Sequence, residues 1–279
     1  MNTRRIRWTL KVIALFSVLS GSGVCCAASE LTKVPNLLYH QLSTPSDPIP
    51  LDDTTVIDVQ SFSAQMKYLH DSGYKTVNAS DLVKLLRQRQ ELPAKSVTIH
   101  FDDGWRSVLA AVPVLKQYHF GATFWLIVSM IGQPGYLTWD DVAQLASNRE
   151  FEFQSHTMSH PWHDGDDMLV WAHRNSVADQ KRIEWELAES KRVLEEKLQQ
   201  KVDLLAWPRG AYDKRLIQDA VASGYTGLFT VEWGLTKAGD DPLRIGRSYI
   251  GSRCGLDAFK QILQDGRSRQ CLQESTQKQ

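Results

Sequence analysis

The sequence predicts a single α/β domain built around a mainly parallel sheet. Short apolar runs rich in β-branched and aromatic residues alternate with longer amphipathic windows from Val34 to the C-terminal region. This alternation is typical of parallel sheets, either doubly wound or closed into a barrel. No Pro-, Gly- or Ser-rich linker and no internal repeat interrupts the pattern, so one core is expected.

The expected strands and helices follow one another along the chain. In the first helical window Phe62, Met66 and Leu69 share one face, and Ser80 is a candidate N-cap for the second. The expected strands are residues 36–40, 76–78, 97–101, 122–127, 152–154, 204–207, 227–229 and 244–248, and the expected helices are residues 61–72, 80–88, 107–118, 138–147, 176–199 and 214–223. Functional residues of such folds lie at the carboxyl ends of strands, so motifs that end a strand carry the most weight.

The N-terminal segment has the order of a secretory signal peptide. Basic residues at positions 4–11 precede an apolar stretch at 12–19, and small residues end at Ala28. That stretch is shorter than the ~20 residues that span a bilayer. Residues 1–28 are therefore predicted to be cleaved, leaving residues 29–279 periplasmic or secreted without stable membrane insertion. A lipid-modified Cys25 or Cys26 and twin-arginine export through Arg4 and Arg5 are weaker alternatives.

Charge and cysteine content limit the expected partners. Lys and Arg together number 32, as do Asp and Glu, and loss of the four basic residues of the signal leaves 28. A mildly acidic mature chain argues against nucleic acid or an anionic membrane as the main partner. Cys254 and Cys271 remain in the mature chain and could pair in an oxidising compartment.

Two adjacent carboxylates, Asp102 and Asp103, close the apolar run at residues 97–101, and Gly104 lets the chain turn. Two like charges at the end of a buried strand are costly unless a cation lies beside them. By itself, this motif fits a solvated Asp-Asp-Gly turn equally well.

A second apolar run ends in His156 and His160, four positions apart. Imidazoles at this spacing can reach one ion, and His with Asp suits zinc or a neighbouring first-row metal. Taken with the aspartate pair, they favour a metal site whose open positions admit water and substrate. Such an ion would acidify water and polarise a carbonyl, and the second aspartate could act as general base.

The leaving amine would need a general acid on the other side. His40 ends the first expected strand and is the candidate, although it could equally well only cap the strand end. A Pro208-Arg209-Gly210 turn follows the expected strand at 204–207 and could present backbone N–H groups to an oxyanion. Such turns are common, so this segment carries little weight alone.

These segments resemble the motifs of the NodB-type polysaccharide deacetylases, carbohydrate esterase family four. Phe101-Asp102-Asp103-Gly104 is similar to the first motif, His156-Thr157-Met158-Ser159-His160 to the second, and Trp207-Pro208-Arg209-Gly210-Ala211-Tyr212 to a divergent third. The resemblance implies a distorted (β/α) barrel of about seven strands. It also implies Asp102 as base, a backbone N–H near Arg209 at the oxyanion, and a divalent metal, zinc before nickel, cobalt or iron, on Asp103, His156 and His160.

Within this family the likeness is greatest to biofilm deacetylases that act on exported poly-β-1,6-linked N-acetylglucosamine. Those proteins open with a Tyr-His strand like Tyr39-His40, so that the acid histidine comes first in the chain. The expected function is metal-dependent N-deacetylation of such a polymer, which makes exopolysaccharide export machinery a partner to test for. The alternatives are a deacetylase of peptidoglycan, chitin fragments or O-acetyl esters, and an inactive glycan-binding barrel.

Three positions depart from the family pattern. His100 stands where Thr is usual, and its side chain is expected to point away from the neighbours of Asp102. Ala206 occupies the place of a common arginine. Arg209 replaces an aromatic residue, which leaves the glycan open and would suit an anionic group on it.

Aromatic residues in or beside the expected loops are candidates for stacking on sugar rings. Packing in the core is the alternative for each of them. The candidates are Trp105, Trp162, Tyr212 and Trp233.

Overall fold

The computed structural model describes residues 32–272, apart from residues 52 and 164. The predicted signal peptide, residues 1–28, lies outside the described residues. No helix among the described residues has the length and apolar character needed to cross a membrane.

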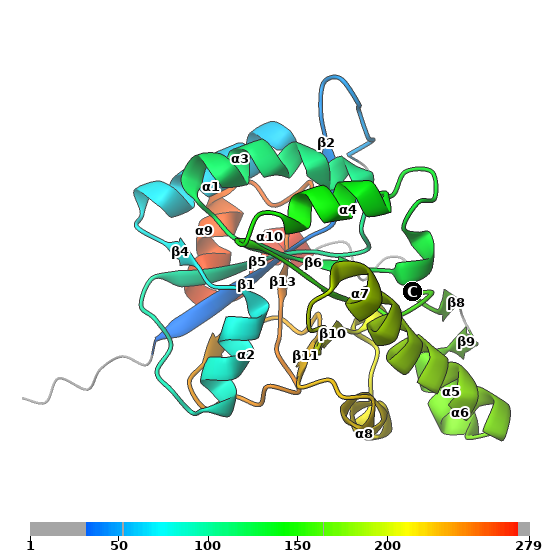
Figure 1. Ribbon diagram of the computed structural model, residues 1–279. Helices are drawn as coiled ribbons and strands as arrows, with labels where there is room; N and C mark the ends of the chain where they lie inside the picture. Colours follow the sequence, from blue (N-terminus) through cyan, green and yellow to red (C-terminus); the bar gives the residue numbers. More distant parts are fainter. Residues whose placement is uncertain (1–31, 52, 164, 273–279) are drawn as a thin grey trace, which may run out of the picture. The chain divides into compact units, whose positions relative to one another are not determined.

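A curled, mainly parallel sheet forms the centre of the described chain (Figure 1). Its order is β11-β10-β7-β6-β5-β1-β12, and β4 and β13 pair with β5 and β1. The parallel strands are β1 (Lys33–Tyr39), β4 (Lys75–Thr76), β5 (Ser96–Phe101), β6 (Ala122–Leu126), β7 (Phe151–Ser155), β10 (Leu204–Ala206), β11 (Gly227–Phe229) and β13 (Ser248–Tyr249), while β12 (Leu235–Lys237) is antiparallel to β1. The predicted distorted (β/α) barrel is confirmed.

The segment at residues 242–249 runs from the edge strand β11 to β1, near the opposite edge of this sheet. Ile245 forms a parallel bridge to Phe229 of β11, and β13 then pairs with β1. We predicted one strand over residues 244–248, and this is wrong because the chain changes partner within that stretch. At the change, a Cβ on Gly246 would lie 2.3 Å from the carbonyl oxygen of Glu232, so only glycine fits.

Helices pack against the sheet in three apolar clusters. The helices α1 (Val59–Asp71), α3 (Val112–Tyr118), α4 (Trp139–Ala146) and α9 (Leu256–Asp265) share one apolar core with β1, β5, β6 and β7 (Figure 1). The helices α5 (Met168–Arg174), α6 (Val177–Glu184) and α8 (Lys214–Ala222) pack with β10 and β11. The helix α2 (Ala79–Arg87) packs against Trp125 and Phe229. Of these, α5 and α9 were not predicted.

Three helical predictions change in detail. The predicted helix at residues 107–118 begins as a 3-10 helix, Arg106–Ala111, and becomes α3 at Val112. The predicted helix at residues 176–199 is interrupted by a π-helical turn, Trp185–Glu189, before it continues as α7 (Ser190–Leu198). The helix α2 is preceded by Asn78 rather than capped by Ser80, whose N–H donates to Glu152 Oε2 at 3.2 Å. The Ser80 N–H is thus satisfied by a strand residue.

The barrel interior holds a chain of neutral hydrogen bonds. Trp125 Nε1 donates to His100 Nδ1 at 3.1 Å, and His100 Nε2 lies 2.7 Å from Thr98 Oγ1. Thr98 donates in turn to Asn36 Oδ1 at 2.7 Å. Burial lowers the pKa of His100 well below its usual value, so a neutral ring with its proton on Nε2 satisfies every partner.

The expected direction of His100 is corrected by this network. Side chains two positions apart share a face of a strand, so His100 and Asp102 both point into the barrel. Both are buried, and the charge of Asp102 acts on the pKa of His100.

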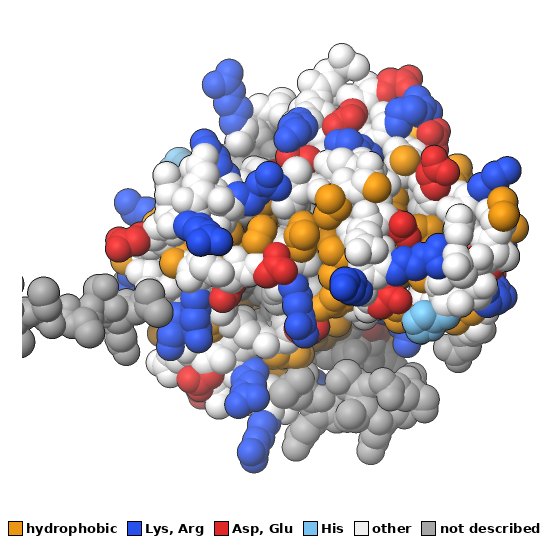
Figure 2. Space-filling model, turned by 90° about the horizontal axis from the view of Figure 1, so that it is seen from below, with side chains coloured by type: hydrophobic (Ala, Val, Ile, Leu, Met, Phe, Trp, Pro, Cys, Tyr) orange, Lys and Arg blue, Asp and Glu red, His pale blue; other side chains and the backbone are white. Residues whose placement is uncertain are grey.

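Basic and acidic side chains are interspersed on the surface in Figure 2, with apolar patches between them. Neither sign of charge dominates that face.

Candidate metal centre

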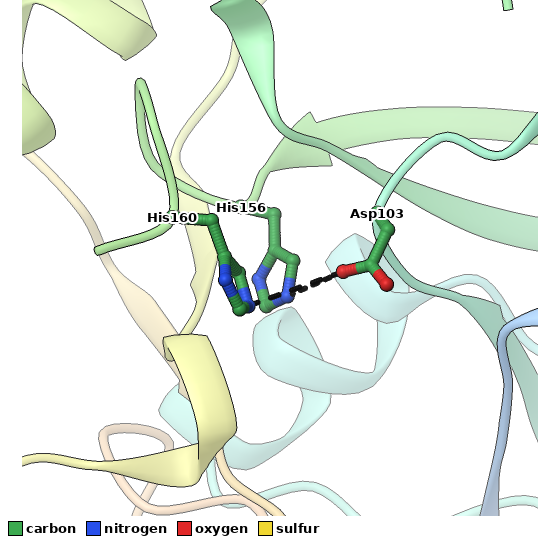
Figure 3. A group of neighbouring side chains, drawn as sticks. All are labelled: Asp103, His156 and His160. Carbon is green, nitrogen blue, oxygen red and sulfur yellow. Dashed lines mark ion pairs between the residues drawn. The ribbon is translucent and has the colours of Figure 1, made fainter. Parts of the chain in front are cut away.

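Three potential ligands converge at the carboxyl ends of β5 and β7. Asp103 Oδ1 lies 3.4 Å from His156 Nε2 and 4.0 Å from His160 Nε2. One donor atom from each residue lies within 4.8 Å of the others. Figure 3 shows the two imidazole rings next to each other, facing the carboxylate of Asp103.

Neighbouring groups hold two of these ligands in place. His156 Nδ1 lies 2.8 Å from the carbonyl oxygen of Ala206, which directs Nε2 towards Asp103. Trp105 Nε1 donates to Asp103 Oδ2 at 2.9 Å and leaves Oδ1 for the histidines. These supports are typical of metal ligands, so the donor set fits a divalent ion such as zinc.

The electrostatic environment of the two histidines agrees with this fit. Burial and the charge of His156 lower the pKa of His160 to about 4, so its ring is neutral at pH 7. For His156, burial opposes the charged form, but the carboxylates of Asp102 and Asp103 outweigh it and raise the pKa. Because these carboxylates favour positive charge at His156 Nε2, the site is suited to a cation.

Asp102 is held by an arginine that the sequence did not reveal. Arg247 Nη1 and Nη2 donate to Asp102 Oδ1 and Oδ2 at 2.6 and 2.9 Å, and both side chains are buried. Burial alone would raise the pKa of Asp102, but Arg247 and nearby histidines lower it, so the carboxylate stays ionised. The one indication in the sequence was Ala206, which stands where the family commonly has an arginine.

The loop between the two histidines is held by Glu186, another residue that was not predicted. The N–H groups of Met158 and Ser159 both donate to Glu186 Oε2 at 2.9 Å, and the Ser159 hydroxyl also bonds its carboxylate. His160 adopts a positive φ of 54°. The π-helical turn thus places a buried carboxylate where it can fix a strained ligand loop.

His40 follows β1 and lines a cavity of about 440 Å³ together with Arg209, Trp233 and Tyr249. Its ring centroid is 5.4 Å from that of Tyr249. Within the described residues, His40 Nδ1 is buried without a hydrogen-bond partner. Tyr39 is paired with Phe101 across β1 and β5, so His40 and Asp102 follow neighbouring strand ends.

The third motif forms a tight turn beside this cavity. Arg209 has a φ of 53°, and its guanidinium Nη1 donates to the carbonyl oxygen of Trp162 at 3.1 Å. A Cβ on Gly210 would lie 2.4 Å from Val231, so glycine is required at its φ of 68°.

The predicted aromatic residues occupy different places. Trp105 contacts Asp103 and stacks on Tyr136, and Trp233 lines the His40 cavity. Tyr212 stacks on Trp207 and donates to Glu232 Oε1 at 2.6 Å. Trp162 is exposed to solvent.

Cys254 and Cys271 form a disulfide, and both line the His40 cavity. The bond attaches the C-terminal helix α10 (Arg269–Leu272) to the loop that follows β13.

A family model described as "Polysaccharide deacetylase" matches residues 89–228. The Bacillus subtilis protein YxkH, which carries that family name, is 29% identical over 203 residues, covering 72% of this chain and 66% of its own. The poly-β-1,6-N-acetyl-D-glucosamine N-deacetylase of Escherichia coli is 26% identical over 205 residues, covering 62% of this chain and 30% of that protein. The structure of IcaB from Ammonifex degensii has a TM-score of 0.71 at 22% identity, covering 85% of this chain and 98% of that one, and so shares the fold.

Proposed function

The chain belongs to the polysaccharide deacetylase family, as its motifs predicted, and we propose that it removes N-acetyl groups from an exported β-linked N-acetylglucosamine polymer. The observation that carries this proposal is the convergence of Asp103, His156 and His160 beside a buried, ionised Asp102. The choice of this substrate is supported by the E. coli relative, which is named for that polymer.

Each nearby side chain has a chemical role in this proposal. A divalent ion held by Asp103, His156 and His160 would polarise the acetyl carbonyl and acidify water. Asp102 would take the proton of the attacking water, because Arg247 keeps it ionised and fixes its orientation.

The opposite side of the site would complete the reaction. His40 would protonate the leaving amine, since its Nδ1 is not engaged by another described residue. A backbone N–H near Arg209 would stabilise the oxyanion of the tetrahedral intermediate.

We further propose that the chain works in the periplasm or outside the cell after loss of residues 1–28. The basic, apolar and small-residue order of that segment supports export. The machinery that exports the polysaccharide would then be a partner of this protein.

Acetate release by the purified protein from poly-β-1,6-N-acetylglucosamine, chitin oligomers and peptidoglycan tests the proposal. We expect the first polymer to be preferred, chelation to abolish release, and zinc to restore it best among zinc, cobalt, nickel and iron. Preference for another glycan would overturn the substrate, and metal binding without acetate release would indicate a glycan-binding barrel.

Two substitutions test the base and acid. Asp102→Asn and His40→Gln should each lower kcat by about 10²–10⁴-fold while leaving metal content unchanged. The matched control is Asp257→Asn, because the Asp257 side chain is 96% exposed on α9. Near-normal turnover in Asp102→Asn would remove it as the base.

A further inference from the structure

A second cavity, of about 390 Å³, begins at the metal-ligand candidate His160. It extends along the hairpin of β8 (Trp162–His163) and β9 (Asp166–Asp167) to the π-helical turn. Trp162 and Trp185 line it, together with Trp171. We name this cavity the Trp162–Trp185 groove.

Trp162 and Trp185 are both exposed to solvent. Trp162 is 52% exposed and Trp185 is 48% exposed, and no other described tryptophan is classed as exposed. Large aromatic surfaces left in water beside a chemical site mark a place where a ligand is stacked.

Polar groups accompany the aromatic rings in the groove. Asp166 Oδ1 accepts from Trp171 Nε1 at 2.6 Å and from Arg182 Nη1 at 2.9 Å. The Arg182 guanidinium lies 4.8 Å from the centroid of the Trp171 ring, and the His163 ring stacks on Trp162 at 4.5 Å. Flat apolar rings with fixed donors and acceptors at their edges match a pyranose, which has C–H faces and equatorial hydroxyls.

The groove borders the proposed reaction centre. His160 lines the groove and is also a candidate metal ligand, and Arg209, which lines the His40 cavity, donates to the carbonyl oxygen of Trp162. A polymer whose reacting unit lies at the metal could therefore place a neighbouring unit between Trp162 and Trp185.

We propose that the Trp162–Trp185 groove is a carbohydrate subsite, which binds a pyranose unit next to the one being deacetylated. The proposal rests on the proposed function for the identity of the polymer. In this subsite Trp185, Asp166 and Arg182 contribute to polymer binding, whereas the reaction takes place at the metal centre.

Kinetics on long and short substrates test the subsite. Trp185→Ala and Trp162→Ala should each raise KM for the polymer about ten-fold, the effect of losing one aromatic stacking contact. Their kcat on the polymer and their activity on an N-acetylglucosamine dimer should stay within about two-fold of the parent protein. Trp185→Phe, which keeps a ring, should recover most of the loss.

Val177→Ala is the matched control, because Val177 is 71% exposed on α6 and does not line the groove. Circular dichroism and metal content of each variant separate loss of the subsite from misfolding. An unchanged KM in both tryptophan variants would overturn the subsite, as would equal losses on polymer and dimer.

Calorimetric titration of a β-1,6-linked N-acetylglucosamine pentamer into the metal-loaded Asp102→Asn protein separates the subsite from the enzymatic proposal. Binding that weakens about ten-fold on adding Trp185→Ala supports the subsite even if the parent protein releases no acetate. Binding that is unaffected by Trp185→Ala overturns the subsite even if acetate is released.

Discussion

Arg247→Met tests the buried pair on which the proposed base depends. The Arg247 and Asp102 side chains are 0% and 3% exposed. At an effective dielectric constant of ~20, opposite charges ~4 Å apart attract by about 4 kcal/mol. Removing one partner of a buried pair costs about 3–5 kcal/mol, because the other charge stays desolvated. We expect Arg247→Met to lower the free energy of unfolding by that amount at pH 7.

The loss should depend on pH in a defined direction. In the parent protein the pKa of Asp102 is lowered, so its stabilising contribution is present above the unfolded pKa of about 3.9 and is lost below it. Without Arg247, burial dominates and raises that pKa, so Asp102 takes up a proton as the pH falls. The difference between the two proteins should therefore narrow between pH 7 and pH 4.

Urea unfolding of metal-free proteins, followed by circular dichroism at several pH values, measures both effects. Adding Asp102→Asn to Arg247→Met should restore stability, since it removes the stranded charge. Arg192→Met, at an exposed ion pair with Glu189, should leave the free energy of unfolding nearly unchanged. A loss below about 1 kcal/mol for Arg247→Met, or one independent of pH, would refute this reasoning.

Three further predictions concern the groups around the site. The pKa of His100 is lowered in the folded protein, so its neutral form stabilises the fold fully above pH ~6.5. Below that pH the free energy of unfolding should fall by up to about 1.4 kcal/mol per pH unit. Urea unfolding of His100→Gln should lack this slope. Glu186→Ala should raise the zinc dissociation constant about 10–100-fold in a dye-competition titration, whereas Glu186→Gln, which can still accept both N–H groups, should change it little. Unchanged affinity in Glu186→Ala would contradict its role. Gly246→Ala should cost about 1–3 kcal/mol in thermal unfolding because its Cβ meets Glu232, and a neutral result would count against that contact.

The strands and motifs were predictable because their signals are local. An apolar run followed by two carboxylates marked the end of β5, and β11 was predicted with the bounds that it has. Parallel strands bring their carboxyl ends to one edge, so His156 and His160 after β7 could be expected near Asp103.

The supports of these residues could not be predicted in the same way. Arg247 is 145 positions from Asp102, and the strand expected over residues 244–248 gave no sign that the arginine would reach that carboxylate. Glu186 reaches the ligand loop only because a π-helical turn changes the direction in which it points. Such contacts depend on the packing of distant elements, which a local pattern does not encode.

The direction of His100 could have been predicted, by contrast. Strand side chains alternate with a period of two, so residues 100 and 102 must share a face once Asp102 is directed into the barrel. Asp102 stays within this alternation, because its N–H still donates to the Tyr39 carbonyl oxygen.

The segment at residues 242–249 also sets the order in which the site can be assembled. Strands β5, β6 and β7 are near one another in the chain and can pair early, whereas Arg247 must close a loop of 145 residues before it reaches Asp102. A refolding chain would thus bring its candidate metal ligands together before Arg247 orients the proposed base, Asp102. Recovery of acetate release should lag behind recovery of helical signal, and would mark the moment when the C-terminal part of the chain has docked.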